Sequence, residues 1–70
     1  MYHARDLVQS IRGLVVVDTC HIADGFWETM VFPCDPNGII SSSMDLDGKR
    51  YDTEPEARIG HQEMICKWGI

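Results

Sequence analysis

Apolar and polar residues recur with two different periods along this chain of 70 residues. These periods predict a helix at each end and strands between them. Near the start, four apolar residues recur at helical spacing: Ala4, Leu7, Val8 and Ile11. They predict a short amphipathic helix from His3 to Arg12. Gly13 is expected to end it, because glycine takes the left-handed conformation of a helix C-cap at no steric cost.

The second predicted helix begins after Thr53 and is the clearest element of the chain. Thr53-Glu54-Pro55-Glu56 has the form of a capping box, in which the Thr53 hydroxyl accepts from the backbone N–H of Glu56. Gly69 is expected to close the helix. Its buried stripe is predicted from helical spacing: Ala57, His61, Met64, Ile65 and Trp68.

Three strands are predicted between the helices: Leu14 to His21, Trp27 to Cys34, and Ile39 to Leu46. The first contains three consecutive valines, which are apolar on both faces. The segment from Ile22 to Phe26 is expected to turn at Asp24-Gly25. A second turn is expected at Asp35-Pro36-Asn37-Gly38, because proline and glycine suit a type I turn followed by a bulge. Residues 47–50 are expected to form a polar loop.

These elements predict an α+β fold in a single domain spanning residues 1–70. Short hairpin connections predict a three-stranded antiparallel sheet. Two amphipathic helices then cover one face of that sheet, in the order α-β-β-β-α.

The face of the predicted sheet without helices is expected to be unusually apolar. Period-2 alternation places Met30 and Phe32 on one face of their strand and Trp27 and Val31 on the other. The second set is expected on the open face, where an exposed apolar surface indicates contact with another polypeptide. We therefore expect partner-binding residues there, for a second protein or a second copy of this chain: Trp27, Val31, Ile39, Val15 and Val17.

Composition limits the classes of partner and location. The hydrophobic fraction of 44% is typical of a globular protein. No apolar run has the length of a membrane span, and the first residues lack the apolar core of a signal peptide, so a cytoplasmic protein without a membrane partner is expected. The three cysteines are expected to be free thiols in a reducing compartment: Cys20, Cys34 and Cys66.

Few residues of the chain are candidates for metal binding or catalysis. No cysteine or histidine pair has the spacing of a structural zinc site, so neither a metal nor another cofactor is expected. The segment from Asp45 to Asp52 is rich in aspartate but lacks the closing glutamate of a calcium-binding loop. A thiol of Cys34 or Cys66 near His61 is the one catalytic alternative. We favour a packed histidine and a protein that is not an enzyme, because a domain this small has little room for a substrate pocket.

Nucleic acid is not an expected partner. The predicted element order is also that of the double-stranded-RNA-binding domain, in which a basic cluster at the start of the second helix contacts phosphates. Here that position carries Glu54 and Glu56, which repel a phosphate backbone. The net charge of −5 also disfavours binding to nucleic acid, and it permits a basic protein partner.

A set of hydrophobic and turn residues is distributed over residues 14 to 68: Glu28 to Phe32, Asp35 to Gly38, Leu46-Asp47, Arg50-Tyr51, Glu56-Ala57, Gly60-His61, Met64 and Trp68. This set resembles a group of small uncharacterised proteins from bacteriophages and prophages. The resemblance implies a phage accessory protein in the cytoplasm of a bacterial host. Small acidic phage proteins are often inhibitors of host defence, including anti-CRISPR proteins, so binding and inhibition of a bacterial host protein are expected by analogy.

The segment Asp52-Thr53-Glu54-Pro55-Glu56-Ala57 is similar to the run that opens a helix in the N-terminal domain of HicB-type antitoxins. Those domains have a three-stranded sheet followed by a helix. The proline and the predicted N-terminal helix depart from that pattern. This second resemblance implies an antitoxin-like module that neutralises a small basic toxin.

Overall fold

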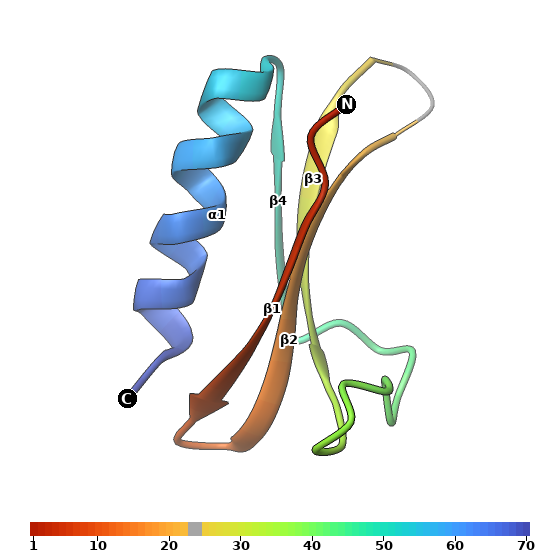
Figure 1. Ribbon diagram of the computed structural model, residues 1–70, viewed down its shortest axis with the longest axis vertical. Helices are drawn as coiled ribbons and strands as arrows, with labels where there is room; N and C mark the ends of the chain where they lie inside the picture. The colour runs from red at the N-terminus through yellow and green to blue at the C-terminus, as the bar shows by residue number, and fades with distance from the viewer. Residues whose placement is uncertain (23–24) are drawn as a thin grey trace.

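One antiparallel sheet and one C-terminal helix form the computed structural model, which describes residues 1–22 and 25–70. The strands follow one another in the sheet in chain order, and α1 lies along one of its faces (Figure 1). The elements are β1 (Ala4–Ser10), β2 (Gly13–His21), β3 (Trp27–Pro33), β4 (Asp47–Tyr51) and α1 (Glu54–Trp68). The predicted three-stranded sheet with two helices, in the order α-β-β-β-α, is therefore wrong, and the order is β-β-β-β-α.

The segment predicted as the first helix is the edge strand β1. All seven of its residues pair with β2, from Ala4 opposite Thr19 to Ser10 opposite Gly13. An isolated helix of about ten residues is marginal in water, and the neighbouring valine-rich strand offers a complete ladder instead. Gly13, expected to end a helix, has a φ of 105° and follows the two-residue turn of the hairpin.

The third predicted strand is misplaced along the chain. Residues 35–46 form an ordered loop, which we call the outer loop, and its Ile40 forms only an isolated bridge with Cys34. The pairing strand is β4, which covers the segment predicted to be a polar loop. Its polar residues suit a strand at the edge of a sheet, where charged side chains oppose pairing with other molecules.

The second predicted strand and the turn after it are confirmed. β3 begins at Trp27, and its successive side chains alternate between the two faces of the sheet. In the turn, Asp35 O accepts from Gly38 N at 2.9 Å, and Gly38 has a φ of 80°. The other predicted turn, from Ile22 to Phe26, includes residues 23–24, which lie outside the described residues.

The C-terminal helix is confirmed from its cap to its end. The Thr53 hydroxyl accepts from the backbone N–H of Glu56 at 3.4 Å and donates to the Glu56 carboxylate at 2.8 Å. Glu54 and Arg58 form the i,i+4 ion pair that their order favours, at 3.2 Å. Within the described residues, no helix combines the length and the apolarity needed to cross a membrane.

The sheet presents to α1 the face opposite to the one expected. Val15, Val17 and Val31 lie in the core with Val8 and Met64, completely shielded from solvent or nearly so. The alternation along the strands is as predicted, but the assignment of its two sets to the two faces is wrong. A period of two defines the two sets and does not say which set the helix covers.

The face turned away from α1, which we call the outer face, is charged in one half and apolar in the other. Arg5 pairs with Asp18 at 3.3 Å, and Arg50 pairs with Glu28 at 3.1 Å, both across neighbouring strands. The outer loop folds over the other half, on the side of the sheet away from α1 (Figure 1). The expectation of an unusually apolar open face is therefore wrong for the half that carries these ion pairs.

Candidate functional site

The interior contains a chain of hydrogen bonds that joins four elements around His61. Helical spacing from Ala57 places this side chain on the face of α1 that meets the sheet, where it is fully buried. Its Nε2 atom lies 2.7 Å from an Asp6 carboxylate oxygen, and its Nδ1 atom lies 2.6 Å from the Thr19 hydroxyl. The Thr19 hydroxyl is in turn bonded to that of Thr29.

The direction of these bonds follows from the donor and acceptor capacity of each group. A carboxylate only accepts, so Nε2 of His61 carries a proton and donates to Asp6. The Nδ1–Thr19 and Thr19–Thr29 bonds continue the chain, since a hydroxyl group can both donate and accept. Burial raises the pKa of Tyr51 above its usual value, and a hydrogen bond with Thr29 opposes that shift.

The order carboxylate, imidazole and hydroxyl is that of a hydrolytic triad, but the hydroxyl is inaccessible. Thr19 and Thr29 are both completely buried, and the Thr19 oxygen is bonded on two sides. A nucleophile has to reach a substrate carbonyl, which this hydroxyl cannot do in the folded chain. The chain of bonds instead satisfies buried polar groups and fastens α1 to the sheet.

An aromatic residue near the N-terminus closes the end of this network. The ring of Tyr2 meets that of His61 edge-on, with 6.4 Å between ring centroids. The guanidinium of Arg58 stacks over Tyr2 at 4.3 Å from its centroid. The start of the chain is thereby held against α1.

The cysteine alternative does not match this geometry. Both ring nitrogens of His61 are occupied, by Asp6 and Thr19, so neither Cys34 nor Cys66 is its hydrogen-bond partner. Burial raises the pKa of the Cys34 thiol, with the nearby Asp35 charge acting in the same direction. A raised pKa disfavours the thiolate that a nucleophile requires. All three cysteines are free, as expected.

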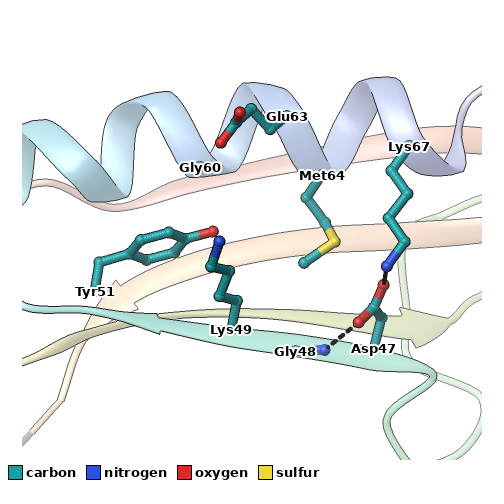
Figure 2. A pocket seen from close by; sticks show the side chains of 8 residues that line it. All are labelled: Asp47, Gly48, Lys49, Tyr51, Gly60, Glu63, Met64 and Lys67. Atoms are coloured by element: carbon teal, nitrogen blue, oxygen red, sulfur yellow. Dashed lines mark hydrogen bonds and ion pairs between the residues drawn. The ribbon is translucent and has the colours of Figure 1, made fainter.

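A groove of about 300 Å³ lies between β4 and α1 (Figure 2). An Asp47 oxygen lies at one end, where it accepts from Lys67 at 2.7 Å and from the Trp68 ring N–H at 2.9 Å. The bonds from Lys67 and then from Trp68 lower the pKa of Asp47. The ammonium group of Lys49 lies 5.7 Å from the centroid of the Tyr51 ring. The groove is therefore lined by groups that already interact with one another.

Gly60 allows α1 to approach β4 closely in this groove. A Cβ atom on Gly60 would lie 2.1 Å from the Tyr51 side chain, far inside van der Waals contact. Figure 2 shows the Tyr51 ring lying directly beneath the helix at this position. Glycine is needed here for space, since a helix interior otherwise disfavours it.

The five residues predicted to bind a partner are not brought together. Val15, Val17 and Val31 are core residues beneath α1, where no partner reaches them in the folded chain. Trp27 is half-buried beside the ring of His21, with 4.5 Å between centroids. Ile39 lies on the outer loop and is 64% exposed.

The outer loop carries three exposed large apolar side chains, one of which is Ile39. We define the loop patch as Ile39, Ile40 and Met44, which are 64%, 37% and 76% exposed. Its backbone is fixed by Asp35, whose carboxylate accepts from the N–H groups of Asn37 and Ile39 at 2.8 and 3.0 Å. These bonds hold the backbone of the patch at Ile39.

Sequence reasoning missed the partners of His61. Asp6 lies in the segment predicted as the first helix, which does not form, and Thr19 and Thr29 lie within predicted strands. One signal was available: a histidine in an apolar helical stripe needs polar partners, and β2 and β3 each carry one threonine on the face that α1 covers.

The described residues contain no cluster of three or more histidine, cysteine or acidic side chains arranged to hold a metal ion. Comparison of the chain with protein-family models, with curated proteins and with solved structures finds no match in any of the three.

Proposed function

We propose that this protein acts by binding another protein and not by catalysis. In line with the resemblance to phage proteins, we further propose that it is a phage accessory protein that binds and inhibits a bacterial host protein in the host cytoplasm. An inhibitor of host defence, such as an anti-CRISPR protein, is the class we favour. The observation that carries the proposal is the loop patch of Ile39, Ile40 and Met44.

The loop patch differs from single exposed apolar residues in two respects. Its three residues are close in sequence, and the backbone of the loop that carries them is held by hydrogen bonds. Single exposed apolar side chains, such as Ile59 on α1, are normal on protein surfaces. The three residues of the loop patch lie within six positions of one loop. Arg5 donates to Gly38 O at 2.9 Å and so ties this loop to β1. A preorganised surface loses little conformational entropy when it binds, which favours affinity.

Affinity capture with matched variants tests the proposal. A tagged protein carrying Ile39→Ser and Met44→Ser is compared with wild type and with Ile59→Ser, which changes an equally exposed isoleucine on α1. We expect wild type and the Ile59 variant to recover the same bacterial protein, and the double variant to lose it. Recovery by all three would show that the loop patch is not the binding surface.

Inhibition needs a separate measurement from binding. The recovered protein is assayed for its own activity with increasing amounts of wild type or double variant. We expect wild type to reduce that activity and the double variant to leave it unchanged. Full activity in the presence of bound wild type would contradict the inhibitor proposal while leaving the binding proposal intact.

An antitoxin-like module that neutralises a small basic toxin is the second candidate. The predicted N-terminal helix, which set the chain apart from HicB-type domains, is replaced by β1, which adds a fourth strand to the sheet, and α1 begins directly after the capping Thr53. The net charge of −5 suits a basic partner. Co-expression that relieves the toxicity of a basic protein encoded beside this chain supports this candidate, whereas the absence of rescue contradicts it.

A further inference from the structure

The two edges of the sheet differ in how well they are protected against pairing with another strand. β4 has only five residues, three of them charged, and its Gly48 N–H is bonded to the side chain of Asp47 at 2.9 Å. β1 has seven residues, of which only Arg5 and Asp6 are charged, and it contains neither proline nor an irregularity in its register with β2. A long, regular edge strand is a template for a further strand. β1 is therefore the edge open to pairing.

The backbone groups that β1 turns outward follow from its hairpin. The two-residue turn makes Ser10 and Gly13 a hydrogen-bonded pair, and such pairs alternate along an antiparallel ladder. Arg5, Leu7 and Gln9 therefore direct their N–H and C=O groups away from β2. One backbone bond agrees with this assignment: the N–H of Ile70 donates to Gln9 O at 3.1 Å. Among the described residues, no backbone bond occupies the outward groups of Arg5 and Leu7.

We propose that β1 pairs with β1 of a second copy of this chain, antiparallel and centred on Leu7, to form one continuous eight-stranded sheet across a two-fold axis. In this register Leu7 lies opposite its own counterpart, and Arg5 lies opposite Gln9 of the second copy. Leu7 is 51% exposed on the outer face, so the pairing covers apolar surface that the single chain leaves open. The Ile70 bond to Gln9 is exchanged for one from Arg5 of the second copy.

Charge excludes two of the alternative two-fold registers. Centring the axis on Asp6 would place two Asp6 carboxylates directly opposite each other, and centring it on Arg5 would do the same with two guanidinium groups. Like charges directly opposite each other destabilise a strand pair. The Leu7 register has no such pair, and it uses all three outward-facing residues of each copy. The edge is therefore complementary to itself, which favours a second copy over an unrelated strand.

Sedimentation and light scattering over a range of concentrations test the proposal. We expect wild type to approach twice the 8.0 kDa mass of one chain as concentration rises. Leu7→Lys should remain at the mass of one chain, because it places two ammonium groups opposite each other. Ile59→Lys, a matched change at a side chain that is 62% exposed on α1, should behave as wild type.

Two further variants test the edge and the register. Leu7→Pro removes an N–H that points away from β2, so it should keep the fold, checked by circular dichroism, and abolish the dimer. An equimolar mixture of Leu7→Lys and Leu7→Glu should regain the doubled mass, since only the Leu7-centred register places the two charges opposite each other. A wild type that keeps the mass of one chain at all concentrations, or a Leu7→Lys variant that dimerises like wild type, would overturn the proposal.

Discussion

At the residue scale, the fold depends on a network that satisfies buried polar groups. His61, Thr19 and Thr29 are all completely buried, and each is bonded to its neighbour in the network. An unsatisfied buried polar group is destabilising by about 1–3 kcal/mol, more than a typical hydrogen bond contributes. The position of the histidine was predictable from helical spacing. Its partners were not, because they depend on which face of the sheet α1 covers.

Replacing one hydroxyl of this network should therefore lower stability without changing the shape of the core. Thr19→Val leaves Nδ1 of His61 without its hydrogen-bond partner, and we expect the free energy of unfolding in urea to fall by about 1–3 kcal/mol. Asp6→Asn keeps an oxygen that accepts from Nε2, so its loss should be below about 1 kcal/mol. Equal stability of Thr19→Val and wild type would show that the network contributes nothing.

Gly60 supports a second prediction at this scale. Glycine to alanine in a helix interior normally stabilises a protein by about 1 kcal/mol. Here the new Cβ would meet Tyr51 at 2.1 Å, so we expect a loss of about 1–3 kcal/mol in thermal or urea unfolding instead. In a Tyr51→Leu background the same change should be neutral or stabilising. A loss of equal size in both backgrounds would contradict the steric explanation.

At the scale of elements, the elements that local sequence determines were predicted and those that depend on distant pairing were not. α1 has its own cap, stripe and ion pair, and β3 has its own alternation and turn. β1 carries a helical pattern that the ladder with β2 overrides, because seven backbone pairs outweigh a weak propensity. β4 has almost no strand signal of its own and depends on β3 and on Asp47.

Asp47 joins β4 to the last turn of α1, and its lowered pKa gives that contact a defined pH dependence. A carboxyl group with a lower pKa in the folded chain adds stability above its ordinary pKa and loses it as pH falls through the folded value. Asp47→Asn should therefore reduce the unfolding free energy by about 1 kcal/mol at neutral pH. The difference from wild type should shrink below the ordinary carboxyl pKa of 3.8.

Urea unfolding of both proteins from neutral pH down to roughly pH 3 measures this difference. Lys67→Gln serves as the comparison, because it removes the main cause of the lowered pKa while keeping the Asp47 carboxylate. In the Lys67→Gln background, Asp47→Asn should have a smaller effect at neutral pH. A difference between Asp47→Asn and wild type that grows as pH falls would contradict the sign of the shift.

At the scale of the whole molecule, the sheet is a central layer with α1 on one side and the outer loop on the other (Figure 1). The valine run of β2 reflects this arrangement: Val15 and Val17 face α1, whereas Val16 faces outward and is still completely buried. A strand covered on both faces is apolar at successive positions instead of alternating. The three consecutive valines were thus a sequence signal for a layer on each face, although they do not identify the outer layer as a loop.

If both layers are packed, both faces of β2 should contribute similarly to stability. Val16→Ala and Val17→Ala each remove two methyl groups from a fully buried site, so we expect each to lower the unfolding free energy by about 1–3 kcal/mol. Urea unfolding gives both values, and equal slopes would show that both variants remain two-state. A loss below about 0.5 kcal/mol for Val16→Ala alone would show that the outer loop only shields the sheet from water. In that case the loop patch would lack the rigid support on which the binding proposal depends, because a loop that does not pack on the sheet cannot hold Ile39 and Met44 in place.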